Sequence, residues 1–328
     1  MTDELHKFIF EGLPVRGMLV RLTGSWQEVL RRREASGPFP EPVRQLLGEM
    51  SAAAVLMQAN IKFAGSVVLQ VFGDGPVKLA VVEAQPDLGF RVTAKVVGDV
   101  PATDNGHLPL EVMVNVGGKG RCAITLDPKD RAPGQQPYQG VVSLHGDEGE
   151  DLHKLSEVLE HYMLQSEQLD TRLILAADDQ IAAGLLIQRL PTQGAGNLAG
   201  ALSSEDEIGL NEQFNRIAHL SASLRREELL TLDVDTILRR LFWEEDLRRF
   251  EPLEGLTGPH FECTCSREKV SNMLRGLGLP EVESILVEQG QVEIGCEFCG
   301  QHYIYDSVDV GEVFSPDIDH PPGSKRLQ

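Results

Sequence analysis

The chain has 328 residues, of which 41% are hydrophobic; this is enough to bury a sizeable core, and the length exceeds that of a usual single core. Its formal net charge of −20 argues against nucleic acid or an anionic membrane surface as the main partner, because both would repel so acidic a protein. The composition therefore fits two domains and neither of these partners.

The N-terminus and the apolar runs indicate a compartment. Residues 1–7 contain no basic segment leading into an apolar one, so no secretory signal is visible. The longest apolar run, residues 52–57, is far too short to cross a bilayer. We therefore expect a soluble, cytoplasmic protein. In that compartment cysteines stay reduced, and clustered cysteines bind metal or sense oxidants more often than they form structural disulfides.

Residues 1–185 are predicted to form an α+β domain, beginning with helices. Capping and helical spacing predict three of them, at 26–33, 42–57 and 151–165. Ser25 is a plausible N-cap for the first helix, and Pro42 suits the first turn of the second.

Strand-like runs make up much of the rest of this domain. They lie at 66–72, 77–83, 90–97, 110–116, 121–126 and 171–176. Glycine-rich turns at 73–76 and 117–120 predict two hairpins. Consecutive hairpins with helices at the ends favour an antiparallel sheet over repeated βαβ units.

This domain carries no recognisable catalytic motif. The glycine-rich segment 117–121 lacks the phosphate-loop spacing and joins two predicted strands, whereas a phosphate loop opens a helix. Neither His-Glu-x-x-His nor Gly-x-Ser-x-Gly occurs in the sequence. We therefore expect a protein that is not an enzyme. Cys122 lies in an apolar run and is expected to be a small buried residue.

Residues 186–255 are predicted to form a metastable helical linker. A flexible break at 193–200 precedes a capping box at 204–207. Between Ser203 and Glu254, 13 acidic and 7 basic residues leave little apolar core, so the segment should fold only while docked. Two apolar stripes should pack on a neighbouring domain; they comprise Leu210, Phe214, Ile217, Leu220 and Leu224, then Ile237, Leu238, Leu241, Phe242, Leu247 and Phe250.

Residues 256–314 contain four of the five cysteines. They form the pairs Cys263-x-Cys265 and Cys296-x-x-Cys299, and four thiolates in tetrahedral array favour zinc. In an extended Cys-x-Cys segment the Cα atoms lie about 6.6–7.2 Å apart, whereas a disulfide needs about 4.4–6.8 Å. Oxidation of the first pair should therefore bend the backbone, so the site could act as a switch.

The elements around the cysteines are predicted to be short. Ser266 caps one helix and Pro280 starts another, while strands at 291–294 and 302–305 lie on either side of the second cysteine pair. So small a lobe has little apolar core, and metal ligation is expected to supply much of its folding energy.

Two histidines and the C-terminal end complete this region. His260 and His302 lie near the cysteines in sequence, but four thiolates already complete a tetrahedron, so neither is expected to be a ligand. Residues 315–328 contain three prolines and are expected to form a flexible tail.

At this point the chain resembles a known family. The segment 261–268 (FECTCSRE), followed after about thirty residues by 296–299 (CEFC), is similar to the signature of the bacterial redox-regulated chaperone called heat shock protein 33. The segments 46–49, 138–142 and 166–172 also resemble that family, in the same order. The resemblance covers nearly the whole chain apart from its two ends.

The resemblance implies an ATP-independent holdase of the stress response. The reduced cysteines would bind one zinc ion per chain and keep the lobe folded, docked and inactive. Peroxide or hypochlorite, with mild unfolding, would release the zinc and form the disulfides Cys263–Cys265 and Cys296–Cys299. The linker would then unfold and expose a surface for unfolding client proteins, and the active form would be a homodimer.

Two other classes stay open on the residues alone. A thiol-disulfide oxidoreductase could use Cys296 and Cys299, although such enzymes place this motif at a helix start, and here strands are predicted on both sides. A structural zinc-ribbon protein is the other alternative, and the acidic balance argues against nucleic acid as its ligand.

Overall fold

The structure, a computed structural model, describes residues 2–34, 37–102, 108–130, 134–191 and 204–315. It divides into two compact units, residues 1–262 and 263–328, hereafter the core unit and the cysteine unit. The predicted break at 193–200 and the tail beyond Ser315 lie outside the described residues. None of the described helices combines the length and apolarity that crossing a bilayer requires. The finer division at 185, 255 and 314 stays a prediction.

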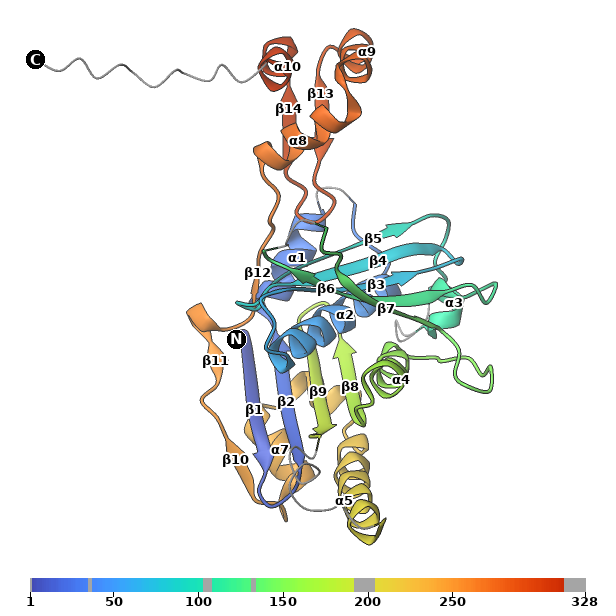
Figure 1. Ribbon diagram of the computed structural model, residues 1–328, viewed down its shortest axis with the longest axis vertical. Coiled ribbons are helices and arrows are strands. Elements are labelled where there is room, and N and C mark those ends of the chain that lie inside the picture. Colours follow the sequence, from blue (N-terminus) through green and yellow to red (C-terminus); the bar gives the residue numbers. More distant parts are fainter. Residues whose placement is uncertain (1, 35–36, 103–107, 131–133, 192–203, 316–328) are drawn as a thin grey trace, which may run out of the picture. The chain divides into compact units, whose positions relative to one another are not determined.

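The first sheet of the core unit brings together segments from both ends of its sequence (Figure 1). Its order is β10-β1-β2-β9-β8, β11 also pairs with β1, and all its pairings are antiparallel. The strands are β1 (Glu4–Phe10), β2 (Val15–Leu22), β8 (Thr171–Ala177), β9 (Ala182–Arg189), β10 (Leu247–Arg249) and β11 (Leu253–Glu254). Both faces are buried: Leu5 joins one hydrophobic cluster, whereas Phe8 and Phe10 join another.

The second sheet has the order β12-β5-β4-β3-β6-β7. Its pairings are antiparallel except for that of β12, which runs parallel to β5. The strands are β3 (Gly65–Phe72), β4 (Val77–Ala84), β5 (Gly89–Val96), β6 (Arg121–Pro128), β7 (Tyr138–Ser143) and β12 (His260–Phe261). The antiparallel sheets with helices confirm the predicted α+β class.

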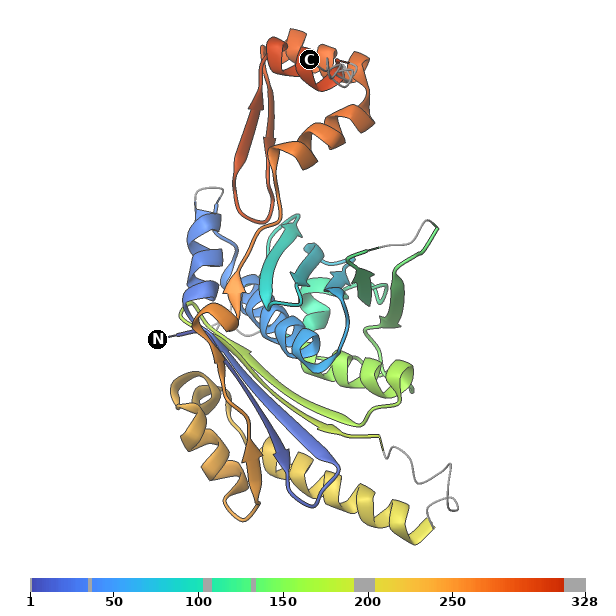
Figure 2. The ribbon, with the colours of Figure 1, turned by 60° about the vertical axis from the view of Figure 1, so that its left-hand side comes forward.

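Helix α2 (Glu41–Asn60) lies between the two sheets (Figures 1 and 2). Its apolar residues join both sheets in one cluster, and Pro42 occupies the first turn as predicted. Gly48 permits close packing on the first sheet, because a Cβ at Gly48 would lie 2.4 Å from the Cβ of Ala177. The other helices around this core are α1 (Gly24–Glu34), α3 (Leu110–Val114) and α4 (Leu155–Glu167).

Helices α5 (Ser204–Ala222), α6 (Arg226–Thr231) and α7 (Val234–Phe242) cover the other face of the first sheet (Figure 2). Ile217, Leu229 and Ile237 are fully buried there against Phe8 and other residues of the sheet. Apolar residues of both predicted stripes are buried against the first sheet, which belongs to the same compact unit and not to a neighbouring one; the side chain of Leu210 lies outside the described residues. These helices, with their buried apolar residues, are hereafter called the helical cover.

The cysteine unit contains two strands and three helices among its described residues. They are α8 (Arg267–Leu277), α9 (Leu279–Gln289), β13 (Val292–Gly295), β14 (His302–Tyr305) and α10 (Ser307–Phe314). The Ser266 side chain accepts from the Lys269 amide and Pro280 lies in the first turn of α9, as predicted. One small cluster forms the core: Leu274, Val282, Val292, Tyr305, Val310 and Val313.

Four predictions for local structure are wrong. The run 110–116 is not a strand, because Leu110–Val114 forms helix α3, with Leu110, Met113 and Val114 buried at helical spacing. Consequently β6 pairs with β3 and β7, and the hairpin predicted at 117–120 does not form. Ser25 does not cap α1 from outside: the helix already contains it, and its amide and hydroxyl donate to Asp3.

The fourth wrong prediction is the end of the second apolar stripe. Leu247 lies in strand β10 on the edge of the first sheet, and Phe250 is half exposed, so neither continues the helical face. Leu247 pairs with Phe10 of the distant strand β1, and the Phe250 amide donates to the Lys7 carbonyl of the same strand, which local periodicity cannot reveal.

Candidate metal centre

The four predicted cysteines converge at one place in the cysteine unit. Cys263 and Cys265 lie in the extended segment before α8, and Cys296 and Cys299 lie in the turn between β13 and β14. All four sulfur atoms lie within 4.8 Å of one another. Residues separated by about thirty positions in sequence therefore form one cluster.

The turn between β13 and β14 orients the second pair. The Cys296 amide donates to the Gln301 carbonyl at 2.9 Å, and the Gly300 amide donates to the Cys296 carbonyl at 2.8 Å. Gly300 has a φ of +69°, a conformation that glycine adopts without strain. The amides of Phe298 and Cys299 donate to the Cys296 sulfur. Such amide donors stabilise a thiolate, so the turn is suited to metal ligands.

The sulfur separations fit a tetrahedral metal site. The sulfur of Cys263 lies 3.7 Å from that of Cys296, and the sulfur of Cys265 lies 3.4 Å from that of Cys299. A zinc ion with Zn–S bonds of about 2.3 Å at a tetrahedral centre places its sulfurs about 3.8 Å apart. Soft thiolate donors with this spacing favour zinc over hard cations such as Mg²⁺ or Ca²⁺.

The cysteine thiols of the cluster differ in pKa when no metal is bound. A hydrogen bond from the Cys296 thiol lowers the pKa of Cys263 to about 4, and the pKa of Cys296 is raised by the same interaction. Burial raises the pKa of Cys299 to about 11. The lowered pKa of Cys263 favours its thiolate, the form that ligates metals and reacts with oxidants.

A tyrosine that sequence reasoning missed contacts the cluster. The Tyr303 hydroxyl donates to the Cys265 sulfur at 3.1 Å, and this interaction raises the pKa of Tyr303. Tyr303 and Tyr305 alternate with exposed residues on β14, and the Tyr305 hydroxyl instead donates to the Arg267 carbonyl at 2.9 Å. The alternation on the predicted strand 302–305 was the only available signal.

The remaining residues considered from sequence lie elsewhere. His302 Nδ1 lies 2.6 Å from a carboxylate oxygen of Glu293 on β13. His260 lies on β12 in the core unit. Cys122 is fully buried in β6, as predicted, and burial raises its pKa to about 12. A thiol held neutral in an apolar core is inert.

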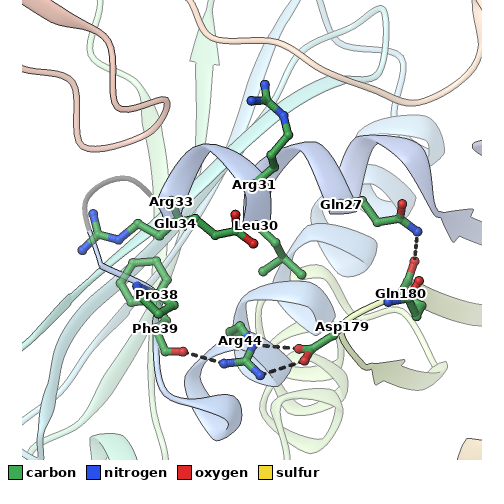
Figure 3. A pocket seen from close by; sticks show the side chains of 10 residues that line it. All are labelled: Gln27, Leu30, Arg31, Arg33, Glu34, Pro38, Phe39, Arg44, Asp179 and Gln180. Atoms are coloured by element: carbon green, nitrogen blue, oxygen red, sulfur yellow. Dashed lines mark hydrogen bonds and ion pairs between the residues drawn. The ribbon is translucent and has the colours of Figure 1, made fainter.

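A pocket of about 320 Å³ lies in the core unit beside α1 and the start of α2 (Figure 3). Arg44 donates to both carboxylate oxygens of Asp179 and to the Phe39 carbonyl, and the Gln27 amide donates to the Gln180 carbonyl. These polar groups bond to one another across the pocket. We therefore interpret the Arg44–Asp179 ion pair as a contact that stabilises the fold. The cysteine cluster is the stronger candidate for the functional site.

Comparisons with known proteins agree with the resemblance around the cysteines. The family described as Hsp33 protein matches residues 3–306. The chain is 46% identical over 316 residues to a 33 kDa chaperonin from Chromobacterium violaceum, covering 96% of this chain and 95% of that one. It is 41% identical over 329 residues to a 33 kDa chaperonin from Methylobacillus flagellatus, covering 99% of each.

A solved structure shows that the fold is shared as well. The crystal structure of a 33 kDa chaperonin from Thermotoga maritima matches with a TM-score of 0.73 at 20% identity, covering 94% of this chain and 97% of that one. The match in sequence extends through the cysteine segments and nearly the whole core unit. The chain therefore belongs to the Hsp33 family of chaperones.

Proposed function

We propose that this chaperone is an ATP-independent holdase whose activity is switched by oxidation of the cysteine unit. The observation that carries the proposal is a cluster of four sulfurs in a unit whose core cluster has only six buried residues. Cys263, Cys265, Cys296 and Cys299 would hold one zinc ion per chain in the reduced state. Zinc in such sites contributes about 10–16 kcal/mol of apparent binding energy, which is also folding energy.

Oxidation would remove the ligands in pairs. Two thiolates give two electrons to one hydrogen peroxide, which becomes two hydroxide ions, and one S–S bond forms. Two such steps consume all four thiolates, and disulfide sulfurs no longer bind the metal. The family resemblance implies the pairs Cys263–Cys265 and Cys296–Cys299. The sulfurs of the alternative pairs Cys263–Cys296 and Cys265–Cys299 also lie close together, at 3.7 Å and 3.4 Å, so the pairing needs a direct test.

A connecting segment would transmit the change to the core unit. Residues 243–262 join the helical cover to Cys263, and the strands through which they pair with sheet edges, β10, β11 and β12, are only two or three residues long. Such short pairings open at little free-energy cost. Once the cysteine unit unfolds, the C-terminal end of this segment becomes a free chain, and fraying would proceed back toward the helical cover.

The helical cover conceals an apolar surface that such fraying could release. Beneath it lie Phe8, Phe10, Leu19 and Leu185, each at most 1% exposed, on the outer face of the first sheet. A holdase needs exposed apolar surface and performs no chemistry on its client. We infer that clients in the cytoplasm are unfolding proteins, that they bind this face and the released helices, and that the active form is a homodimer.

The test follows zinc release and client protection together. Reduced, zinc-loaded protein is treated with peroxide at raised temperature; a colorimetric indicator reports zinc, and light scattering of a thermally unfolding protein reports holdase activity. We expect about one zinc per chain to leave as aggregation is suppressed, and a dithiol reductant to reverse both. Zinc that stays bound, or leaves without any gain in suppression, would contradict the switch.

Two matched variants make this test specific. Cys299→Ser should fail to hold zinc and should suppress aggregation without peroxide, because the unit lacks a ligand from the start. Cys122→Ala, which removes the only cysteine outside the cluster, should behave like the wild type. Peptide mapping of the oxidised protein by mass spectrometry then decides between the two disulfide pairings.

A further inference from the structure

A second group of metal-binding side chains lies in the core unit. Ligand atoms of Asp87, His260 and Glu262 lie within 4.8 Å of one another. His260 and Glu262 come from β12 and the residue after it, and Asp87 comes from the turn between β4 and β5. None of these residues belongs to the cysteine cluster or to the proposed switch chemistry.

The pairing of β12 with β5 fixes the positions of the two residues from this strand. His260 lies opposite Gly89 in parallel register, and the Glu262 amide donates to the Phe90 carbonyl at 2.9 Å. Side chains alternate along a strand, so His260 and Glu262 lie on one face. Phe261 turns to the other face, where it packs on the core and lies 4.8 Å from the Arg32 guanidinium.

The lack of a side chain at Gly89 leaves room for the ligand atoms. A Cβ at this position would lie 2.5 Å from Oε2 of Glu262 and 3.1 Å from Nε2 of His260. Both atoms therefore lie directly over the Gly89 backbone. The Gly89 amide donates to Oδ1 of Asp87 at 3.1 Å, which holds that carboxylate beside the same residue.

The hydrogen bond on the other side of the imidazole sets its tautomer. Nδ1 of His260 lies 3.1 Å from the Gly258 carbonyl. A carbonyl only accepts, so Nδ1 carries the proton, and in the neutral ring Nε2 keeps its lone pair. Metal-binding histidines are typically oriented by such a bond to a backbone carbonyl. The free lone pair is on Nε2, the nitrogen that lies over Gly89 beside the Glu262 carboxylate.

We propose that Asp87, His260 and Glu262 form a binding site for a divalent first-row transition-metal ion. One imidazole and two carboxylates suit ions such as Mn²⁺, Co²⁺ or Zn²⁺, with water completing the coordination. Asp87 and Glu262 are exposed, so the ion can enter from solvent. The net charge of −20 raises the local concentration of cations around the chain.

An ion at this site would act on the segment that leads to the cysteines. It would tie β12, a strand of two residues ending two positions before Cys263, to the turn between β4 and β5. Nitrogen and oxygen ligands are not consumed by peroxide, unlike the four thiolates. In the proposed switch, on which this consequence rests, the bound ion would keep β12 paired and slow activation after zinc has left.

Manganese is the probe that separates this site from the cysteine cluster, because Mn²⁺ prefers oxygen and nitrogen and does not displace zinc from thiolates. Full-length, reduced, zinc-loaded protein is titrated with MnCl₂, and electron paramagnetic resonance reports free Mn²⁺. We expect one saturable Mn²⁺ per chain. His260→Ala and Gly89→Ala should each weaken its binding at least tenfold, the first by removing a ligand and the second by filling the space over the backbone.

His302→Ala is the matched control, since it removes a half-exposed histidine that pairs with Glu293 in the cysteine unit; it should bind Mn²⁺ like the wild type. One zinc per chain and an unchanged circular dichroism spectrum verify that each variant is folded. Uptake that never saturates, as on any acidic surface, overturns the proposal, and so does equal binding by His260→Ala. Neither result bears on zinc release or aggregation suppression, so the proposed holdase switch is tested separately.

Discussion

The two units of this protein are stabilised in different ways. The core unit buries large side chains such as Trp26, Phe10 and Met50 completely, in two clusters that cover both faces of its first sheet. The cysteine unit has one cluster of six residues and a group of four sulfurs. Apolar burial contributes roughly 1.5–3 kcal/mol for each large side chain, so we expect the core unit to fold without a ligand and the cysteine unit to need the proposed zinc ion.

The helical cover is intermediate between these two cases. It belongs to the core unit, and its apolar face is buried on the first sheet. Its outer surface is charged, and the buried cation Arg21 joins it to β2 through bonds to backbone carbonyls. Further polar contacts join Arg226 of α6 to the Ala177 carbonyl and Asn211 of α5 to Arg189. A segment held by one apolar face and a few polar contacts can leave while the sheet beneath it stays folded.

Removal of the metal should reveal the difference in stability between the two units most clearly. Chelation of zinc under reducing conditions is expected to unfold residues 263–315, at a cost of about 10 kcal/mol or more in that unit alone, while α2 and both sheets stay folded. Hydrogen exchange followed by mass spectrometry should show lost protection in α8–α10 and retained protection in α2. Re-addition of zinc is the control. Equal loss of protection in both units would show that the core unit also depends on the metal.

Arg21 offers a way to release the helical cover without touching a cysteine. Its guanidinium donates to the carbonyls of Leu229 at 2.9 Å, Leu232 at 2.6 Å and Leu230 at 3.3 Å. Charge-assisted bonds of this kind contribute about 1.5–3 kcal/mol each. Arg21→Met should therefore destabilise the docking of α6 by about 3 kcal/mol and give partial aggregation suppression in the reduced protein.

The matched control for Arg21 lies on the same strand. Arg16 points to the opposite face of β2 and donates to Gln188 on β9 at 2.6 Å. Arg16→Met should leave hydrogen exchange of α6 and α7 unchanged. If Arg21→Met exposes these helices but gives no suppression in the light-scattering assay, then release of the helical cover is not sufficient for client binding.

The sequence predicted the cysteine cluster better than it predicted the fold that carries it. Cysteines are rare in this chain, and four of them occur in two closely spaced pairs, Cys263 with Cys265 and Cys296 with Cys299. This pattern can be recognised without any knowledge of the sheets. Leu110–Val114 is too short for its periodicity to distinguish a helix from a strand. The pairings of β10 with β1 and of β12 with β5 join distant segments through strands of two or three residues, which carry no local signal.

Strands β1, β2, β7 and β9 were not predicted, and β9 shows why. Its residues Ala182–Gln188 are buried on both faces of the first sheet, so no polar face produces alternation. The contact between Tyr303 and Cys265 was missed for a related reason. It depends on how β14 lies against the segment before α8, and only the folded cysteine unit defines that arrangement.

Tyr303 tests how far the metal site depends on its surroundings. Tyr303→Phe removes the hydroxyl that donates to Cys265 while keeping the ring on β14. Loss of such an outer hydrogen bond typically weakens metal affinity about 10- to 100-fold. Competition with a chromophoric chelator measures the change. Tyr305→Phe, whose hydroxyl donates to the Arg267 carbonyl instead, should keep the zinc affinity and lower only the stability of the unit.

The smallest expected effect concerns the core unit and its dependence on pH. Glu49 on α2 faces a cavity of about 370 Å³ that Lys154 and Arg226 also line, and burial raises the pKa of Glu49 to about 7 from a usual 4.5. Between these two values the folded chain holds a proton that the unfolded chain has released. The contribution of Glu49 to stability is therefore complete below about pH 4.5, falls as the pH rises toward 7, and is lost above it.

The Glu49 side chain is only partly buried, and two cations lie near it. We therefore expect the free energy of unfolding to fall by about 1 kcal/mol over this pH range, well below what a fully buried carboxyl would give. Urea unfolding of the zinc-loaded protein at pH 5 and pH 8 measures it. Glu49→Gln cannot ionise and should remove the difference, whereas Glu41→Gln at an exposed position of the same helix should keep it. If the difference in stability between pH 5 and pH 8 persists in Glu49→Gln, another group causes the pH dependence. The cavity, which Arg226 of the helical cover also lines, would then have a purely structural role.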